Sequence, residues 1–374
     1  MTNQKLRITG IRQSIVEMPL DKPLRTAIHE IKRVACLLVT VETDAGLNGE
    51  GYGFCFDTQR MRAIAQFAAS LGQRMTGKDP HHVEALWADL FKSNNFYGQA
   101  GISVLATNPL DIACWDIIGK AAERPLYQVW GAYRDRVPVY ASAGLWMSSG
   151  LDDLRAEARA FLEQGFKAMK VRLGSARWQD DVARVEALRD VIGDDNALMA
   201  DSNQGLDLSR ALRLGRALER FGLAWYEEPL PTWDHEGTAT LARELDTPIA
   251  NGETEYTRYG IRNMVKAGAA DIMMPDLQRM GGYTEMRKVM GLLASHDIPI
   301  APHIFTEHSL HIVASSSNAI YAEHMPWFER LFKERMRIDR DGTIALPQGP
   351  GVGFTFDWNA IEPYRLSDQA SIQT

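Results

Sequence analysis

Cysteine is scarce in this chain of 374 residues: Cys36, Cys55 and Cys114 are its only cysteines, and they form no CxxC pair. An odd and widely scattered set argues against a disulfide framework, and a thiolate zinc site needs thiols close together in the sequence. We therefore expect free thiols and a reducing compartment, the cytoplasm, as the location of the protein.

Long apolar segments are missing as well. The longest runs, such as VACLLV at 34–39, are far shorter than the ~20 residues of a membrane-spanning helix. The N-terminal sequence MTNQKLRITG also lacks the apolar core of a signal peptide. With a net charge of -7 at pH 7, the chain offers little attraction for nucleic acid or for an anionic membrane. We expect a soluble protein whose partner is a small molecule.

What is present suffices for two domains. The length exceeds what a single core usually holds, and 45% of the residues are hydrophobic. Residues 1–130 mix strand-like segments with helical patterns, one of which we expect to begin at Asp79-Pro80. This mixture predicts an α+β domain over 1–130, to which a C-terminal segment from about 348 to 374 returns.

Residues 131–347 have a different texture, in which short apolar segments alternate with amphipathic helical patterns. Such alternation predicts parallel βαβ units, and eight of them make a (β/α)8 barrel, although a doubly wound sheet has the same regular spacing. The eight strand candidates are VPVYASAG (137–144), FKAMKVRL (166–173), ALMADSN (197–203), AWYEEPL (224–230), PIANGE (248–253), DIMMPD (271–276), PIAPH (299–303) and AIYAEH (319–324).

Acidic residues mark the ends of three successive strand candidates. Asp201, Glu227 and Glu253 stand there at two intervals of 26 residues. A barrel brings the ends of neighbouring strands together on one face, where three carboxylates repel one another unless a cation lies between them. Oxygen ligands of this kind suit Mg²⁺, so the pattern predicts a magnesium site. Taken singly, each acid could instead cap a helix or lie on the surface.

The other strand ends carry polar residues too. Asp276 and His303 end the next two candidates, 27 residues apart, so the carboxylate can fix the tautomer of the imidazole and raise its basicity. Read alone, His303 would be an ordinary loop histidine. Lys170 and Arg172 point to the same face of their strand, where two buried cations need anions nearby. Glu323 ends the last strand and would donate a hydrogen bond to an enolate oxygen if protonated, or form an ion pair.

A series of motifs recurs at characteristic intervals along the chain: DIACWDIIGK, PLYQVWGA, KVR, ADSNQG, WYEEPL, NGE, PDLQRMGG, APH, AEH and PGVGF. Together they resemble the mandelate racemase-like subgroup of the enolase superfamily over nearly the whole chain. The resemblance implies a modified TIM barrel of the (β/α)7β type under an α+β capping domain, and assembly as a homo-oligomer.

The resemblance also implies the roles of single residues. It makes the three strand-end acids, Asp201, Glu227 and Glu253, the ligands of Mg²⁺. It makes Asp276 and His303 the acid–base dyad.

Further residues take their expected roles from the same resemblance. Glu323 becomes the partner of the oxyanion, and Lys170 matches a lysine that contacts the substrate carboxylate. Asn203 matches a polar residue beside the metal. Two segments of the capping domain, here 19–32 and 51–59, would close over the substrate as loops.

His29, in the first of these segments, is a candidate substrate contact, although an ordinary loop histidine is an equal alternative.

One position departs from the family pattern, because the second lysine of its KxK motif is Arg172 here. A guanidinium keeps its proton at ordinary pH and is a poor base, so only His303 is competent to remove a proton, which disfavours racemisation. Arg172 would instead serve as an electrostatic clamp or as a ligand for substrate oxygens.

We therefore predict a Mg²⁺-dependent dehydratase that abstracts the proton α to the carboxylate of a sugar acid and eliminates the β-hydroxyl. Its product would be a 2-keto-3-deoxy acid, and the ending AEHMPWFERLFKE favours an aldarate such as galactarate or talarate. A racemase or epimerase on the same scaffold, and a non-catalytic sugar-acid-binding protein, are the alternatives.

Overall fold

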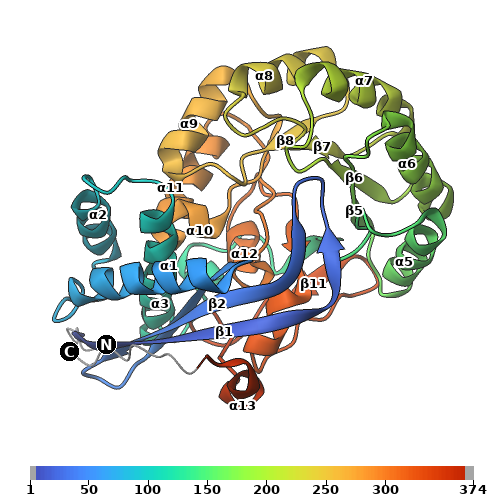
Figure 1. Ribbon diagram of the computed structural model, residues 1–374. Coiled ribbons are helices and arrows are strands. Elements are labelled where there is room, and N and C mark those ends of the chain that lie inside the picture. Colours follow the sequence, from blue (N-terminus) through green and yellow to red (C-terminus); the bar gives the residue numbers. More distant parts are fainter. Residues whose placement is uncertain (1–5, 367–374) are drawn as a thin grey trace.

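The structure, a computed structural model, describes residues 6–366. Its N-terminal part begins with a three-stranded antiparallel sheet in the order β1-β2-β3, made of β1 (Ile8–Arg25), β2 (Glu30–Thr43) and β3 (Gly49–Cys55). The hairpin of β1 and β2 is long and reaches over towards the barrel (Figure 1).

The helices that follow the sheet are α1 (Thr58–Gln73), α2 (Val83–Ser93), α3 (Ile102–Ala121) and α4 (Leu126–Val129). Two of them, α1 and α3, pack on the sheet. Helix α3 lies so close to β3 that a Cβ on Gly49 would stand 1.9 Å from the carbonyl oxygen of Ala113, and one on Gly51 would stand 2.3 Å from that of Pro109. Only glycine fits such an approach of two backbones.

From residue 136 onwards, parallel strands alternate with helices that surround them (Figure 1). The strands lie in the order β10-β4-β5-β6-β7-β8-β9. The elements are β4 (Arg136–Ala141), α5 (Leu151–Glu163), β5 (Ala168–Arg172), α6 (Trp178–Ile192), β6 (Ala197–Asp201), α7 (Leu208–Leu218), β7 (Trp225–Glu227), α8 (His235–Glu244), β8 (Ile249–Asn251), α9 (Thr257–Ala267), β9 (Ile272–Met273), α10 (Leu277–Met280), α11 (Tyr283–Ala294), α12 (Thr306–Ala314) and β10 (Ala322–His324).

The seventh strand candidate, 299–303, closes the barrel between β9 and β10. It pairs through isolated parallel bridges, of which Met273 with Ile300 and Ile300 with Ala319 link it to both sides. After β10 the chain enters a short 3-10 helix, Pro326–Leu331, where an eighth barrel helix would otherwise stand. The fold class predicted from the sequence is confirmed: an N-terminal α+β part and a C-terminal α/β barrel.

The C-terminal stretch runs back to the N-terminal part. β11 (Thr343–Ala345) pairs antiparallel with β4, and α13 (Trp358–Ile361) follows. Between these two elements, Gly351 forms a parallel β-bridge with Pro125. After α13, the N–H of Leu366 donates to the carbonyl of Ile15 at 3.0 Å. Residues 367–374 of the returning segment lie outside the described residues, and the domain boundaries at 130 and 348 stay a prediction.

Three local predictions are wrong. The helix expected at Asp79-Pro80 begins at Val83, because residues 79–82 form a turn in which the N–H of His82 donates to the carbonyl of Asp79 at 3.1 Å. The segment 19–32, expected as a loop, is mostly strand, because the pairing of β1 with β2 continues up to a turn at 26–29. The segment 51–59, also expected as a loop, is mostly strand too, because β3 pairs with β2 up to Cys55 and α1 begins at Thr58.

The cysteines are free thiols, as expected, and two of them, Cys36 and Cys114, are buried. Within residues 6–366, no helix combines the length and the apolar character that crossing a membrane requires.

His311 in α12 ties the barrel to the parts that cover it. Its Nδ1 accepts from the backbone N–H of Tyr127 at 3.3 Å, and its Nε2 lies 2.8 Å from the carbonyl of Val352. These two contacts fit the neutral imidazole. Burial lowers the pKa of His311 to about 4, against the small opposing effect of the Val352 carbonyl.

This burial predicts a component of acid destabilisation that can be isolated. The unfolded chain takes up the His311 proton near pH 6.5 and the folded protein only near pH 4, so acid favours unfolding. Between pH 7 and pH 5 the parent should lose about 2 kcal/mol more unfolding free energy than His311→Gln, which does not titrate. Urea unfolding of both proteins at each pH measures the difference, because all other groups titrate in both. Parallel pH profiles would contradict the assignment.

Candidate active site

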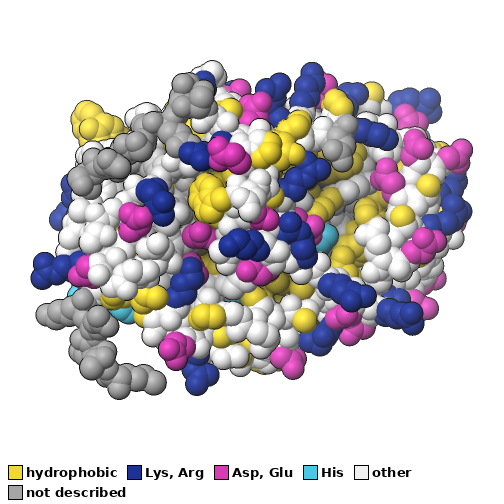
Figure 2. Space-filling model, turned by 90° about the horizontal axis from the view of Figure 1, so that it is seen from below, with side chains coloured by type: hydrophobic (Ala, Val, Ile, Leu, Met, Phe, Trp, Pro, Cys, Tyr) yellow, Lys and Arg dark blue, Asp and Glu magenta, His cyan; other side chains and the backbone are white. Residues whose placement is uncertain are grey.

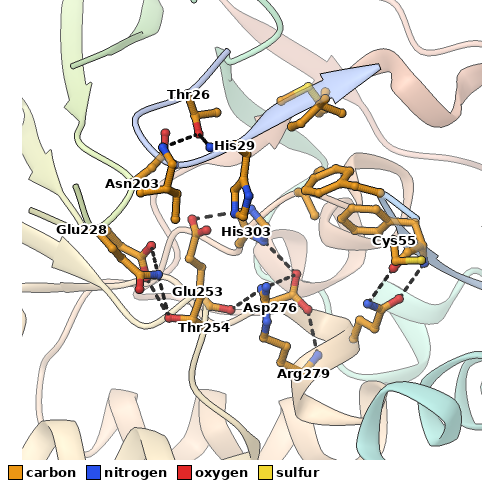
Figure 3. Close-up of a pocket in the computed structure, with 18 of the residues that line it drawn as sticks. Thr26, His29, Cys55, Asn203, Glu228, Glu253, Thr254, Asp276, Arg279 and His303 are labelled. Carbon is orange, nitrogen blue, oxygen red and sulfur yellow. Dashed lines mark hydrogen bonds and ion pairs between the residues drawn. The ribbon is translucent and has the colours of Figure 1, made fainter. Parts of the chain in front are cut away.

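A cavity of about 490 Å³ lies between the capping hairpin and the C-terminal ends of the barrel strands (Figure 3). The hairpin contributes Thr26 and His29, whereas Glu253, Asp276 and His303 each come from the end of a different barrel segment. The C-terminal face is where barrels of this kind carry their chemistry.

Of the three strand-end acids, Asp201 and Glu227 lie beneath this cavity and Glu253 lines it. Asp201 and Glu227 are the last residues of β6 and β7 and pair in register, and Glu253 follows β8 by two residues. Asp201 is 1% exposed and Glu227 is not exposed at all. Burial raises the pKa of Glu227 to about 8, with Lys170 opposing the shift and the carboxylates of Asp201 and Glu253 adding to it. The arrangement therefore holds more negative charge than it can keep without cations.

Lys170 supplies one such cation. Its Nζ lies 2.6 Å from Glu227 Oε1, 3.0 Å from Glu323 Oε1 and 3.5 Å from Asp201 Oδ2. Burial lowers the pKa of Lys170, but Glu227 and Glu323 outweigh it, so the ammonium stays charged. As the side chains stand, no three acidic, histidine or cysteine groups among the described residues are gathered closely enough to coordinate one ion. The acids have to converge further around a metal.

The donor set nevertheless fits Mg²⁺ in kind. All three acids offer oxygen, which hard divalent cations prefer, and the excess negative charge calls for a cation of higher charge than one ammonium. Asn203, after β6, donates from its N–H and its Nδ2 to the two oxygens of Asp201, at 2.8 and 3.1 Å. Its own Oδ1 is buried and has no hydrogen-bond partner within residues 6–366.

Asp276 and His303 come together as predicted. Asp276 Oδ2 lies 2.7 Å from His303 Nδ1, and the two residues form a parallel bridge. Asp276 Oδ1 caps α10 by accepting from the N–H of Arg279 at 2.8 Å, which fixes the carboxylate. His303 Nε2 faces the cavity, 3.5 Å from Glu253 Oε2. Burial lowers the pKa of His303, but Glu253, Asp276 and Glu323 outweigh it and raise the pKa to about 9.

Glu323 lines the cavity at the end of β10, the strand next to the segment that carries His303. One of its oxygens bonds Ser142, and the other accepts from the N–H of Ile304 at 2.7 Å. Burial raises the pKa of Glu323, but Lys170, His303 and Arg172 outweigh it and leave the pKa below its ordinary value. Of the two forms considered from the sequence, the ion-paired carboxylate is therefore the one present.

The site residues expected from the sequence lie at two depths. Lys170, Asp201 and Glu227 form a buried layer that does not line the cavity. The residues that line it are His29, Arg172, Asn203, Glu253, Asp276, His303 and Glu323. His29 lies near the hairpin turn, above His303 in Figure 3, where burial lowers its pKa more than Glu253 raises it.

Sequence reasoning missed several cavity residues. Glu228 accepts from Gln204 Nε2 at 2.9 Å and from Thr254 Oγ1 at 3.0 Å, which links the turns after three neighbouring strands. Arg279 donates to the carbonyl of Glu253 at 2.7 Å. Glu228 directly follows Glu227 in the sequence and Arg279 lies one helical turn beyond Asp276, so both had a signal. Trp146 had none.

Comparison with known protein families assigns almost the whole chain. Residues 9–131 match the N-terminal domain of mandelate racemase and muconate lactonizing enzyme, and residues 153–360 match the enolase C-terminal domain-like family. This chain belongs to the enolase superfamily. The resemblance inferred from the motifs is thereby confirmed.

Members of the enolase superfamily with known activities resemble this chain over its full length. The L-talarate/galactarate dehydratase of Salmonella typhimurium is 33% identical over 95% of this chain and 90% of its own. The 3,6-anhydro-alpha-L-galactonate cycloisomerase of Streptomyces coelicolor is 32% identical over 95% of this chain and 98% of its own. The crystal structure of L-talarate dehydratase from Polaromonas sp. JS666 with Mg and L-glucarate superimposes with a TM-score of 0.91, at 33% identity, over 98% of both chains.

The hairpin that covers the cavity rests on glycine. Ala27, in its turn, lies so close to Gly174 and Gly205 that a Cβ on them would stand 2.6 and 2.7 Å from the Cβ of Ala27. The backbone of Met147 adds a hydrogen bond to the carbonyl of Arg25, at 3.1 Å. Side chains of any size at these glycines would lift the turn from the barrel.

We predict that Gly205→Ala opens the hairpin without unfolding the barrel. The new methyl group meets Ala27 and the Ser202 carbonyl, which lies 3.1 Å from it, so the amides of Thr26 and His29 should exchange faster with deuterium. Hydrogen–deuterium exchange of the peptide that contains residues 22–31 measures the effect. Gly291→Ala, where nothing lies within 4 Å of the new Cβ, is the matched control. Equal exchange in both variants would show that the turn does not rest on Gly205.

Proposed function

We propose that this chain is a Mg²⁺-dependent acid-sugar dehydratase that turns a sugar acid into its 2-keto-3-deoxy acid. The observation that carries the proposal is His303 held by Asp276 at 2.7 Å and facing a cavity above three acids at strand ends. The activity of the Salmonella typhimurium relative and the Mg and L-glucarate in the Polaromonas structure support the reaction class and the cofactor.

His303 would act as the base in its neutral form, which Mg²⁺ bound to Glu253 would favour by offsetting the carboxylate that raises the pKa of His303. Its Nε2 takes the proton from C2 of the substrate, and the electron pair of the C2–H bond moves towards the carboxylate. Mg²⁺ held by Asp201, Glu227 and Glu253 would act as a Lewis acid on that carboxylate and stabilise the developing enediolate charge. The Asp276 carboxylate stabilises the imidazolium that forms.

The same imidazolium then completes the elimination. As the C2=C3 bond forms, the C3–O bond breaks, and the hydroxyl takes the proton from His303 and leaves as water. The resulting enol takes a proton at C3 while its C2 hydroxyl loses one, which gives the 2-keto-3-deoxy acid. Glu323, Lys170 and Arg172 would contribute charge at the site. Arg172 would not transfer a proton, because the guanidinium is too weak a base.

The competing reaction is isomerisation or racemisation on the same scaffold. The cycloisomerase relative supports this alternative. Incubation with a panel of acid sugars in D₂O separates the two. Dehydration gives a ketone that forms a semicarbazone, whereas racemisation gives deuterated diastereomers without a ketone.

We propose an aldarate as substrate, as the Salmonella typhimurium relative supports, and a homo-oligomer in the cytoplasm, consistent with the free thiols. Acidic and basic side chains are interspersed on the face in Figure 2, which supports a small molecule as partner over nucleic acid or a membrane surface.

Removal of the base should stop the chemistry and leave the metal site intact. We predict that His303→Asn, which keeps a polar group beside Asp276, lowers kcat by at least about 100-fold, the usual contribution of a general base. His303 is not among the proposed ligands, so the variant should still bind Mg²⁺ in calorimetry, with an affinity close to that of the parent. Asn at the exposed His296 is the control. Turnover that survives in His303→Asn would remove this residue from the mechanism.

Removal of a metal ligand should have the opposite signature. Glu253→Gln loses one charged oxygen donor, so we predict Mg²⁺ binding weaker by at least about tenfold. The neighbouring Glu255, whose Oε1 lies 2.8 Å from His235 Nε2, provides the matched control Glu255→Gln. Calorimetric titration of both variants with Mg²⁺ decides the point, and an unchanged affinity in Glu253→Gln would contradict its assignment.

A further inference from the structure

Arg172 is a buried cation whose hydrogen bonds are incomplete. The side chain is 5% exposed, and its Nη2 donates to Ser142 Oγ at 3.1 Å. Its Nε lies 3.4 Å from Asp201 Oδ2, yet Nε and Nη1 have no hydrogen-bond partner within residues 6–366. Buried donors are almost always satisfied, and Arg172 lines the cavity, so the missing acceptors belong to whatever fills it.

Lys170, two residues earlier, differs from Arg172 because its hydrogen-bond donors all have acceptors nearby. Its ammonium has three donors, and three carboxylates lie within 3.5 Å of Nζ. It does not line the cavity. Of the two cations of the KVR motif, only Arg172 has donors left for a substrate.

Trp146 fixes the plane of the Arg172 guanidinium. The Arg172 Cζ lies 4.7 Å from the centroid of the Trp146 ring, and Trp327 stacks behind that ring at 6.0 Å with an interplanar angle of 12°. A guanidinium carries its donors in its plane, so an aromatic platform directs them sideways while it stabilises the charge.

The Trp146 platform is itself rigidly built. Leu145 has a positive φ of 55°, and its N–H and carbonyl are bound by Glu157 and by the N–H of Arg172, at 2.6 and 3.1 Å. Arg184 donates to the carbonyl of Trp146 at 2.7 Å and also reaches the carbonyl of Arg172 at 3.3 Å. One buried arginine therefore ties the tryptophan loop to the strand that carries Arg172.

We propose that Arg172 binds the substrate carboxylate next to C2 and that Trp146 is the positioning residue that aims its donors. The inference rests on the proposed function and adds Arg172 to the residues that hold the substrate. A rigid fork suits a carboxylate better than a point charge does, because it can donate two parallel hydrogen bonds.

The test measures binding and turnover separately. Calorimetry with saturating Mg²⁺ in a His303→Asn background gives the dissociation constant of each acid in a panel from glycolate to galactarate. For the acid that binds best, Arg172→Gln and Trp146→Leu should each raise the dissociation constant at least about tenfold, and Trp146→Phe, which keeps a ring under the guanidinium, should recover most of the loss.

Three controls make the outcome specific. Trp146→Leu should leave the Mg²⁺ affinity unchanged, which a general disturbance of the site would not. Leu at Trp233, which is 81% exposed, should change neither constant. Arg172→Lys should bind the acid more weakly than the parent although the charge is kept.

The inference is overturned if Arg172→Gln and Trp146→Leu bind the acid as tightly as the background protein, or if Trp146→Phe is no better than Trp146→Leu. Acids that bind but lose no water with the unsubstituted enzyme overturn the proposed function and leave the binding result standing. Failure of every acid to bind overturns both.

Discussion

The structure depends on negative charge concentrated inside a barrel and balanced there. Asp201 and Glu227 are buried at the ends of neighbouring strands, and Lys170 meets both. Burying a carboxylate in this way costs several kcal/mol unless a cation lies beside it. The acids, Lys170 and Arg172 therefore depend on one another, because removing one of them leaves a buried charge without its partner. Lys170 and Arg172 already offset part of this negative charge, and the expected metal ion would add to that compensation.

The positions at which the barrel strands end bring these charged groups together. Parallel strands in register bring Asp201 beside Glu227, and the turns after them are strained: Asn203, Glu228 and Ile304 have φ values of 40°, 37° and 45°. Non-glycine residues adopt such angles only where surrounding contacts determine them, which is common at active sites. The capping hairpin then closes the cavity from above, seated on glycines that leave room for its turn.

Much of the site could be predicted from the sequence, because the strand ends and the intervals between them can be recognised there. The pairing of Asp276 with His303 and the convergence of the acids follow from regular intervals. Trp146 could not be predicted, because its role depends on a loop held by Arg184, which lies far from it in the sequence. The hairpin was taken for a loop because nothing local distinguishes a long strand pair from one. The depth of Lys170 also depends on three-dimensional packing alone.

The exchange of a lysine for Arg172 shows how one scaffold can carry different reactions. An amine at this position can take a proton when its pKa falls, and then both faces of the substrate carbon have a base. A guanidinium stacked on Trp146 at 4.7 Å stays charged and offers fixed donors, so on the proposed role the same position would bind the substrate and would not exchange protons. Proton transfer would then be confined to the face of His303. Removal of the C2 proton and departure of the C3 hydroxyl need only that one face, whereas inversion at C2 needs both. The residue proposed to bind the carboxylate would therefore also narrow the chemistry to elimination.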